Sequence, residues 1–429
     1  MAKKEKLRLG IAGLGNVGVG LVKLVQAQKE LLLPGQLEIT AVSARSRSRD
    51  RGVDISHYGW ADDATDLATS DDVDVYVELI GGSDGPARRT VETALMNGKH
   101  VVTANKALIA EHGYELAQLA EANNVHLLFE AAVAGGVPIV RVIRDSLSGV
   151  NIERVSGILN GTCNYILSEM LDKGASYEEV LKEAQALGYA EADPYLDVSG
   201  MDAAHKALIL ACMAFGAKPD FSKVRVSGVD KIEATDINFA NKLGYRIRLV
   251  AEALRLEAGV RVAVAPVLVP LGHPLAQVTG PTNAVVVEGE PVGQVTMTGP
   301  GAGEGPTASA VMGDIVRLFD GPATAPFGVP VSSLKDLFVD TSGEGLASAW
   351  FIRLKLADKS GAMAAVTNTL AACDVSIDKL LQDSAGDTAA APAAIVTHDC
   401  KRKDAEMAVR KLTELEYCVD APRLIRIEA

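Results

Sequence analysis

The chain has 429 residues, of which 48% are hydrophobic and 23% charged, and its 42 basic and 55 acidic side chains give a formal net charge of −13. At roughly 100–200 residues per domain, this length predicts two to four domains, and the hydrophobic content argues against intrinsic disorder. The acidic balance disfavours nucleic acid and anionic membranes as partners, because both require clustered lysine and arginine. With no apolar run long enough to span a membrane and five scattered cysteines, the sequence predicts a cytoplasmic protein with reduced thiols.

The first 130 residues alternate short apolar strands with helices. Strands are predicted at residues 7–12, 37–43, 73–79, 100–103 and 126–129, and helices from just after residue 18 to about 29 and at about 85–97 and 106–123. This alternation predicts an α/β fold with a doubly wound parallel sheet of Rossmann type. We assign residues 1–133 to this dinucleotide-binding domain and expect a helix at about 305–320 to complete it.

The middle of the chain has a different pattern, which predicts an α+β substrate domain at residues 134–320. A glycine-rich stretch at 131–138 precedes predicted helices at 139–147, 163–173, 177–187 and 202–216, with a strand at 154–159. Residues 223–298 are mainly strand-like. A second glycine-rich stretch, 299–305, leads into a predicted helix at 307–319.

The last part of the chain begins after a segment rich in proline, glycine and serine, residues 321–349, which is predicted to be a linker. Beyond it, strands are predicted at 350–357, 375–381, 393–398 and 417–427, with helices at 362–372 and 404–414. The order βαββαβ predicts a small autonomous ferredoxin-like domain at 350–429. Residues 383–392 are expected to form its hairpin loop.

A glycine pattern directly follows the first predicted strand. Residues 13–18 read GLGNVG, which fits GxGxxG, and the pattern leads into a predicted helix. In that context one glycine makes a tight turn, one lets the backbone approach a pyrophosphate and one lets the helix pack on the strand. A glycine-rich turn without a ligand is the alternative. The candidate cofactor-binding residues are Gly13, Leu14, Gly15, Asn16, Val17 and Gly18.

The end of the second predicted strand is where the cofactor ribose would be recognised. NAD enzymes place an acidic residue there, whereas an arginine suits a 2′-phosphate. Residues 43–51 read SARSRSRDR, in which Arg45 is best placed and Arg47 is the second choice, while Glu38 lies too early in the strand. The run favours NADP, with NAD also usable. A solvated basic loop is the alternative.

The densest polar cluster, residues 188–206, lies beside an apolar helix. Ser199 and Asp202 have the spacing of a capping box and predict a helix start near Gly200. Asp202 and Lys206 then share one face of a largely buried helix, where a charged pair is costly unless it has partners or a function. A surface salt bridge beside a solvated acidic loop is the alternative.

Two further polar residues lie near this chemistry. Lys106 comes just past the strand at 100–103, at the carboxyl end of the sheet, where open α/β folds bind ligands. An ordinary first-turn helix lysine is the alternative for Lys106. His205 points about 100° away from Lys206 on the helix, so we expect it to be structural. The sequence has neither a Ser/His/Asp set nor a histidine-rich metal set.

Together these residues resemble a known family. The chain is similar to homoserine dehydrogenase, in the monofunctional bacterial form that carries a C-terminal ACT domain. The matching stretches are 10–18, 101–106 (VVTANK), 130–138 (EAAVAGGVP), 157–164 (GILNGTCN), 187–206 (LGYAEADPYLDVSGMDAAHK) and 299–307 (GPGAGEGPT). They span essentially the whole catalytic part, and the block at 187–206 is highly specific.

The resemblance implies NAD(P)-linked interconversion of L-homoserine and L-aspartate 4-semialdehyde, a step towards threonine, methionine and isoleucine. Carried over by motif, Lys206 donates and accepts the proton, Asp202 orients it and contacts the amino acid, and Lys106 lies at the reaction centre and can share the proton transfer. Glu191 is implied to bind the substrate ammonium group. Further contacts around the substrate are implied for Asp197, Asn160, Gly161 and Thr162.

The resemblance also implies a structural monovalent cation, usually Na⁺. Its implied ligands, mostly backbone carbonyls, come from Glu130, Val133, Gly135 and Val137. Oxygen ligands suit a hard cation. Near the end of the catalytic part, Gly303 is implied to lie in a loop that contacts the cofactor.

For the C-terminal part, the resemblance implies an ACT domain and, as a hypothesis, feedback inhibition by L-threonine. The turn at 358–361 matches the family's effector turn, but Ala362 and Met363 follow it where another aliphatic pattern is usual, and the later loop is alanine-rich. These departures leave the effector open. The family also implies that the substrate domain at 134–320 mediates dimerisation and that the protein is a homo-oligomer, either a dimer or a tetramer.

Two other interpretations compete. The first is another NAD(P)-linked amino-acid oxidoreductase with the same cofactor half, which the intact block at 187–206 disfavours. The second is a catalytically inactive ligand sensor built from Rossmann and ACT domains. The presence of Lys106, Glu191, Asp202 and Lys206 together disfavours the sensor, because a sensor has no need of a proton-transferring lysine.

Overall fold

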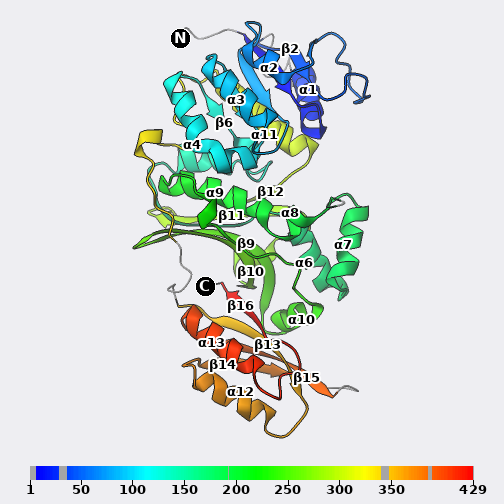
Figure 1. The fold of residues 1–429 in the computed structure, drawn as a ribbon, viewed down its shortest axis with the longest axis vertical. Coiled ribbons are helices and arrows are strands. Elements are labelled where there is room, and N and C mark those ends of the chain that lie inside the picture. Colours follow the sequence, from blue (N-terminus) through cyan, green and yellow to red (C-terminus); the bar gives the residue numbers. More distant parts are fainter. Residues whose placement is uncertain (1–5, 29–35, 192, 340–346, 385–388, 429) are drawn as a thin grey trace.

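The structure is a computed structural model that describes residues 6–28, 36–191, 193–339, 347–384 and 389–428. Parts of the expected linker (340–346) and of the expected hairpin loop (385–388), together with residue 192 of the acidic block, lie outside the described residues. Three parts follow one another along the long axis of the molecule, blue to cyan, then green, then orange to red (Figure 1). The chain returns from the second part to the first through one yellow-green helix, α11.

The first part is built on a six-stranded sheet in which every neighbouring pair is parallel. The strand order is β3-β2-β1-β4-β5-β6, which reverses direction between β1 and β4 and makes a topological switch point there. The expected doubly wound sheet is confirmed. Its strands are β1 (Leu7–Ala12), β2 (Leu37–Ser43), β3 (Gly59–Ala61), β4 (Val75–Glu78), β5 (His100–Thr103) and β6 (Leu127–Leu128).

Helices cover both faces of this sheet. They are α1 (Asn16–Gln28), α2 (Ala64–Thr69), α3 (Pro86–Met96), α4 (Lys106–Ala122) and, from far along the chain, α11 (Glu304–Arg317). A Cβ added to Gly20 of α1 would lie 2.7 Å from the side chain of Glu304, so α11 packs closely on α1. The short elements β3 and α2 were not predicted, because residues 59–69 lack an apolar run of strand or helix length.

The second part packs helices on one face of a mixed sheet (Figure 1). The strands of this part run in the order β12-β11-β7-β9-β10, and short β8 (Arg225–Val226) pairs with β10. Helix α10 (Ala234–Lys242) lies in a segment expected to be mainly strand, which is a correction. The other elements are α5 (Ile139–Arg141), β7 (Asn151–Ile158), α6 (Gly161–Lys173), α7 (Tyr177–Ala186), α8 (Tyr195–Val198), α9 (Met201–Phe215), β9 (Tyr245–Leu256), β10 (Gly259–Pro270), β11 (Thr282–Glu290) and β12 (Gly293–Pro300).

The C-terminal part has the element order β13 (Trp350–Ala357), α12 (Ala362–Ala371), β14 (Ile377–Gln382), β15 (Ala390–Thr397), α13 (Arg402–Thr413) and β16 (Arg423–Ile427). Its strands lie in the order β16-β13-β15-β14. Edge strand β16 pairs in parallel with β10, so the two sheets are continuous. Arg353 of β13 also donates hydrogen bonds to Asp236 (2.6 Å) and Glu233 (2.5 Å) at the start of α10. The unit expected to be autonomous therefore shares backbone and ion-pair contacts with the second part.

Part of the expected linker is packed rather than free. Phe327 is buried, and a Cβ added to Gly113 of α4 would lie 2.9 Å from its ring. Isolated β-bridges join Lys335 to Ala217 and Phe338 to Val260. The segment that leads to the C-terminal part is thus held along the first two parts as far as residue 339.

The cysteines and the helices bear on where the protein resides. All five cysteines are unpaired, and four of them are buried. Within the described ranges, no helix combines the length and apolarity needed to cross a membrane. The cytoplasmic location stays a prediction.

Candidate functional site

The three glycines of the GLGNVG run meet different surroundings at the end of β1. Gly13 has a φ of +104°, and a Cβ there would lie 2.3 Å from the carbonyl oxygen of Leu79. A Cβ on Gly18 would lie 2.1 Å from the carbonyl oxygen of Gly13. A Cβ on Gly15 would meet nothing within 4 Å. Gly13 and Gly18 therefore close the turn on itself, while Gly15 leaves an open cradle at the start of α1, where a pyrophosphate can approach the backbone.

Sequence reasoning missed a buried carboxylate at the switch point. Glu78, the last residue of β4, is fully buried and accepts hydrogen bonds from the N–H groups of Ile80 (2.7 Å) and Gly81 (3.1 Å) and from the Thr103 hydroxyl (2.5 Å). The turn after β4 is thereby tied to the end of β5. The available signal was an acidic residue closing an otherwise apolar strand.

Asn105 continues this network to the helix that carries Lys106. Its N–H donates to the Thr103 hydroxyl (2.9 Å), and its side chain donates to the carbonyl of Gly82 (2.7 Å). The same side chain caps α4 by accepting from the N–H of Leu108 (3.1 Å). These bonds fix the first turn of α4, and with it Lys106, beside the crevice.

Asp202 joins two lysines that are distant in the sequence. Lys106 Nζ lies 3.1 Å from Asp202 Oδ1, and Lys206 Nζ donates to Asp202 Oδ2 over 2.8 Å. Lys206 also donates to the carbonyl oxygen of Leu159 at 2.7 Å, which uses two of its three N–H donors. The side chain of Lys106 is 40% exposed, against 12% for Asp202 and 10% for Lys206. Lys206 is therefore shielded from solvent, whereas Lys106 is the member of the cluster that solvent or a ligand can reach.

Asn160 holds two carboxylates of the cluster from the end of β7. Its amide donates 3.0 Å hydrogen bonds to both Asp197 Oδ1 and Asp202 Oδ2, and its carbonyl oxygen caps α6 through the N–H of Cys163 (2.7 Å). A Cβ on Gly161 would lie 2.5 Å from the carbonyl oxygen of Pro281. The close approach of the 281 loop therefore favours glycine at this position.

The ionisation of the cluster follows from burial and charge. Burial opposes ionisation of Asp202, but Lys206 and Lys106 together outweigh it and hold the pKa of Asp202 well below its usual value. The carboxylate of Asp202 in turn raises the pKa of Lys106. Burial raises the pKa of Asp197, against the hydrogen bond from Asn160. Asp202 is therefore a carboxylate at neutral pH and Lys106 an ammonium group, and the exposed end of Lys106 favours a ligand oxygen that carries negative charge.

The start of α9 differs from expectation. The helix begins at Met201, close to the predicted place, but its N-cap is Gly200 with a φ of +86° and no side-chain cap. The Ser199 hydroxyl is buried without a hydrogen-bond partner in the described part of the chain. The predicted Ser199–Asp202 capping box is therefore wrong. Gly200 makes the turn in a left-handed conformation, and the carboxylate of Asp202 pairs with Lys106 and Lys206 instead.

Two predicted substrate residues lie at the edge of the cluster. Glu191 is exposed, and its backbone carbonyl accepts from the Gln185 side chain at 3.1 Å. The Thr162 hydroxyl donates to the carbonyl of Tyr189 at 2.7 Å, which fixes the segment before Glu191 onto α6. The structure thus brings Asn160, Asp197 and Asp202 together but leaves Glu191 free of that hydrogen-bond network among the described residues.

The arginines in the basic run after β2 differ in whether their side chains make contacts. The guanidinium groups of Arg47 and Arg51 each lie 5.9 Å from the ring centroid of Trp60 in β3. Arg45 is exposed and makes no hydrogen bond or ion pair with the described residues. Glu38 pairs with Lys6 at 2.5 Å, at the other end of the strand. The side chains of Arg45 and Arg49 are therefore both available among the described residues, and Arg45 is the nearer in sequence to Ser43, whose carbonyl accepts from the N–H of Gly13 at 2.9 Å.

The expected cation ligands lie in a turn between the first two parts. Ala134 and Gly135 have φ angles of +52° and +37°. The carbonyl oxygens of Val133 and Gly135 accept no hydrogen bond among the described residues, whereas that of Val137 accepts from Ile139 at 2.8 Å. The Glu130 carboxylate is occupied by the N–H groups at the start of α5, at 2.8 and 3.0 Å. Two free carbonyls in a left-handed turn fit a hard cation.

The glycine-rich stretch before α11 closes over this turn. A Cβ on Gly135 would lie 2.8 Å from the carbonyl oxygen of Gly301, and a Cβ on Gly301 would lie 2.1 Å from the Asn283 side chain. The Asn283 amide is buried with neither polar atom paired in the described ranges, which is consistent with a ligand nearby. Gly303, with a φ of +121°, is the N-cap of α11. The stretch thus links the cation turn to the helix that packs on α1.

His205 takes a structural position. Its ring stacks on Phe221 with centroids 4.6 Å apart, and its Nε2 lies 3.7 Å from Glu111. Lys206, the next residue, points instead to Asp202. The expectation that His205 faces away from the cluster therefore agrees with the structure.

Comparisons with known proteins cover both halves of the catalytic part. Residues 138–316 match the family described as "Homoserine dehydrogenase", and residues 13–130 match the one described as "Homoserine dehydrogenase, NAD binding domain". Homoserine dehydrogenase of Neisseria gonorrhoeae is 39% identical over 436 residues, covering 99% of each chain.

Solved structures agree along the chain. A crystal structure of a homoserine dehydrogenase from Thiobacillus denitrificans matches with a TM-score of 0.91 and 37% identity, covering 99% of this chain and 98% of that one. A hyperthermophilic archaeal homoserine dehydrogenase in complex with NADPH matches with a TM-score of 0.63 and 28% identity, covering 73% of this chain and 97% of that one. The resemblance drawn from the sequence motifs is therefore confirmed.

Proposed function

The chain belongs to the homoserine dehydrogenase family, and from that premise we propose that it interconverts L-homoserine and L-aspartate 4-semialdehyde by NAD(P)-linked hydride transfer. The observation that carries the proposal is Asp202 between Lys106 and Lys206, at the carboxyl ends of the strands that also present the open cradle at Gly15. This step serves threonine, methionine and isoleucine biosynthesis.

In the proposed mechanism a bound nicotinamide would supply the hydride acceptor, and the charged cluster transfers the proton and stabilises charge. Lys206 removes the hydroxyl proton during oxidation and returns it during reduction, with its orientation set by Asp202 and the carbonyl of Leu159. Lys106 stabilises negative charge on the same oxygen as an ammonium group. Glu191, exposed beside the cluster, binds the substrate ammonium together with Asp197 and the 160–162 segment.

The activity is tested by homoserine-dependent reduction of NADP and NAD, followed at the absorbance of the reduced nicotinamide. We expect saturable turnover with L-homoserine and with at least one of the two cofactors. An inactive ligand sensor would bind cofactor yet give no turnover, and another amino-acid oxidoreductase would turn over a different amino acid more efficiently. Either result would contradict the proposal.

We propose that Arg45 recognises the 2′-phosphate and makes NADP the preferred cofactor. The support is its exposure beside the crevice, while Arg47 and Arg51 are engaged with Trp60. Replacing Arg45 with alanine should weaken NADP about tenfold or more, since a charge-assisted contact contributes roughly 1.5–3 kcal/mol, and should leave NAD nearly unchanged. KM values for both cofactors measure the effect, with Arg47→Ala as the matched control. An equal loss for both cofactors would show that Arg45 does not read the phosphate.

A structural Na⁺ ion is proposed at the turn that contains Val133 and Gly135. The free carbonyls there, with the remaining ligands expected from Glu130 and Val137, support a hard cation that would brace the junction between the first two parts. Gly303, at the end of the stretch that covers this turn, is proposed to contact the cofactor. Thermal melting in Na⁺ compared with a large organic cation tests the ion, because equal melting temperatures would contradict its structural role.

The C-terminal part is proposed to be an ACT domain that mediates inhibition by L-threonine. The strand order β16-β13-β15-β14 with two helices supports the domain assignment. Titrating threonine into the homoserine assay tests the response, and unchanged turnover at saturating threonine would refute it.

We further propose that the protein is a homo-oligomer, either a dimer or a tetramer. A monomer in sedimentation equilibrium would contradict this proposal.

A further inference from the structure

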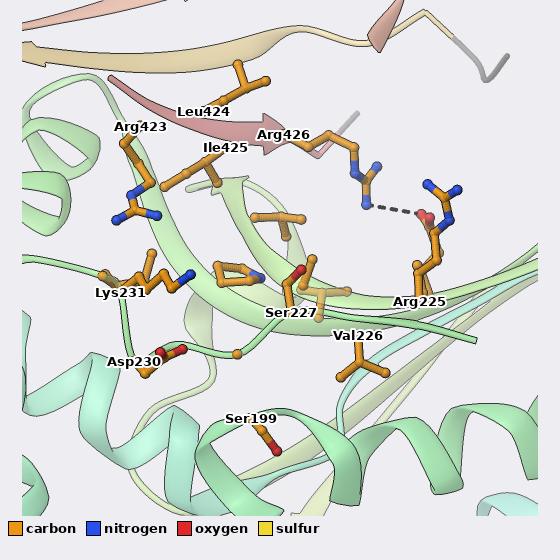
Figure 2. A pocket seen from close by; sticks show the side chains of 18 of the residues that line it. Ser199, Arg225, Val226, Ser227, Asp230, Lys231, Arg423, Leu424, Ile425 and Arg426 are labelled. Carbon is orange, nitrogen blue, oxygen red and sulfur yellow. Dashed lines mark hydrogen bonds and ion pairs between the residues drawn. The ribbon is translucent and has the colours of Figure 1, made fainter. Parts of the chain in front are cut away.

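A cavity of about 700 Å³ lies between the C-terminal part and the second part, where β16 pairs with β10. Its walls come from β16, from β10 and from the segment 225–232, and its floor is the turn between α8 and α9. In Figure 2, Arg423 and Arg426 project from β16 above the cavity, while Ser227, Lys231 and Ser199 lie below. This volume is in the range of small-molecule sites.

The side chains that line the cavity carry an excess of positive charge. Six of them are basic and two, Asp230 and Glu252, are acidic; the basic ones are Arg225, Lys231, Arg261, Arg402, Arg423 and Arg426. Glu252 is already bound by Arg261 and Arg426, and Arg402 pairs with Glu406 at 2.7 Å. Glu252 is therefore neutralised by two of the arginines, while Asp230 forms no ion pair in the described part of the chain.

Two cations of the cavity remain without a counter-charge. Neither Arg423 nor Lys231 forms an ion pair in the part of the chain that the structure describes. Arg423 Nε is moreover buried without a hydrogen-bond partner there. Figure 2 shows the Arg423 side chain reaching from β16 toward the loop that bears Lys231. An anion with two negative charges would satisfy both side chains at once.

The floor of the cavity belongs to the segment that presents the catalytic carboxylates. The N–H of Val229 donates to the carbonyl of Val198 (2.9 Å), and a Cβ on Gly228 would lie 2.2 Å from that same oxygen. The segment 225–232 is therefore packed tightly against the α8–α9 turn. Asp197 and Asp202 flank this turn in the sequence, so a molecule seated in the cavity touches the turn that connects the two carboxylates.

We propose that this cavity is a binding site for a small organic dianion, a dicarboxylate or a phosphate monoester, held between Arg423 of the C-terminal part and Lys231 of the second part. The occupant bridges the two parts beside the β16–β10 pairing. Binding follows from the cavity itself, whereas an effect on turnover rests on the proposed function.

Calorimetric titration of the full-length protein at constant ionic strength tests the site, with succinate and inorganic phosphate as dianion probes and acetate as the monoanion. We expect saturable binding of at least one dianion, about tenfold weaker in Arg423→Gln and in Lys231→Gln. Arg410→Gln, which removes an exposed charge from α13, is the matched control and should bind as the wild type does. The two probes distinguish a dicarboxylate from a phosphate ligand.

The location is checked by fluorescence, because the chain has two tryptophans and only Trp350 lines the cavity. In a Trp60→Phe background, the emission of Trp350 should change with the same dissociation constant as the calorimetric signal. The absence of saturable binding of both dianions would overturn the proposal. So would equal weakening in Arg410→Gln, which would indicate general charge screening.

An activity measurement then separates this proposal from the proposed function. The bound dianion should change the KM for homoserine about twofold or more in the wild type and not in Arg423→Gln. An active enzyme that binds the dianion without any kinetic change would overturn the link through the α8–α9 turn to the catalytic carboxylates. Loss of all activity with homoserine would instead refute the proposed function and leave the binding data as the test of the site.

Discussion

Replacing Lys206 with alanine is expected to lower kcat for homoserine oxidation by about 10²–10⁴-fold, the range of a lost general acid–base group. The side chain is 10% exposed, and Asp202 and the carbonyl of Leu159 fix the position of its amine, which alanine lacks. Cofactor affinity should stay within about twofold, because the glycine run lies on another element. Steady-state kinetics and a separate cofactor titration measure the two effects.

The controls for Lys206→Ala guard against a folding defect. Lys206→Met keeps the apolar stem of the side chain and should show the same kinetic loss with a melting temperature close to that of the wild type. His205→Gln alters the adjacent helix residue, which stacks on Phe221, and should keep most turnover. A near-normal kcat in Lys206→Met would show that Lys206 does not transfer the proton.

The pH dependence separates the two lysines. Because Asp202 raises the pKa of Lys106 above its usual value of 10.5, Lys106 remains an ammonium group at all working pH values. Lys106→Met should therefore lower kcat by a similar factor at every pH between about 6 and 9. A variant of the true proton-transferring residue should instead lose the pH dependence of kcat. If Lys106→Met flattened the pH profile, Lys106 would carry the proton.

The sequence predicted those parts of the fold that depend on local patterns. Strands β1, β2, β5 and β13 have the predicted bounds because each is a mainly apolar or alternating stretch that ends at a polar residue or turn. Helix α10 was missed because it is short, half polar and opened by a reciprocal cap between Glu233 and Asp236, which is not a common capping pair. The parallel pairing of β16 with β10 joins residues about 160 positions apart, and no local pattern specifies it.

In the candidate site, too, local contacts could be predicted from the sequence, whereas contacts between distant segments could not. The Asp202–Lys206 pair is an i, i+4 pair on one helix and could be derived from spacing alone. Lys106 lies 96 positions before Asp202, and only the sheet topology brings α4 to α9. Gly200 replaced the predicted serine cap because a left-handed backbone is decided by the packing of the turn against Val226 and Val264. The Glu78–Thr103 bond likewise depends on two neighbouring strands ending at the same level.

The same substitution, glycine to alanine, is expected to have opposite consequences at Gly15 and Gly18. Neither residue has a positive φ, so alanine fits the backbone equally well at both positions. A Cβ at Gly18 would lie 2.1 Å from the carbonyl oxygen of Gly13, whereas one at Gly15 meets nothing within 4 Å. Gly18→Ala must therefore move the helix away from the strand, at a cost of about 2 kcal/mol or more.

Melting without cofactor and cofactor titration separate the two outcomes. Gly18→Ala should lower the melting temperature of the cofactor-free protein by about 4–8 °C, whereas Gly15→Ala should leave it unchanged. Gly15→Ala should nevertheless weaken NADP about tenfold or more, or about 1.4 kcal/mol, because its methyl group occupies the space through which the pyrophosphate approaches the backbone. Normal cofactor affinity in a stable Gly15→Ala variant would mean that the phosphates do not lie over Gly15. The assignment of the GLGNVG run as the cofactor cradle would then fail, even with the fold intact.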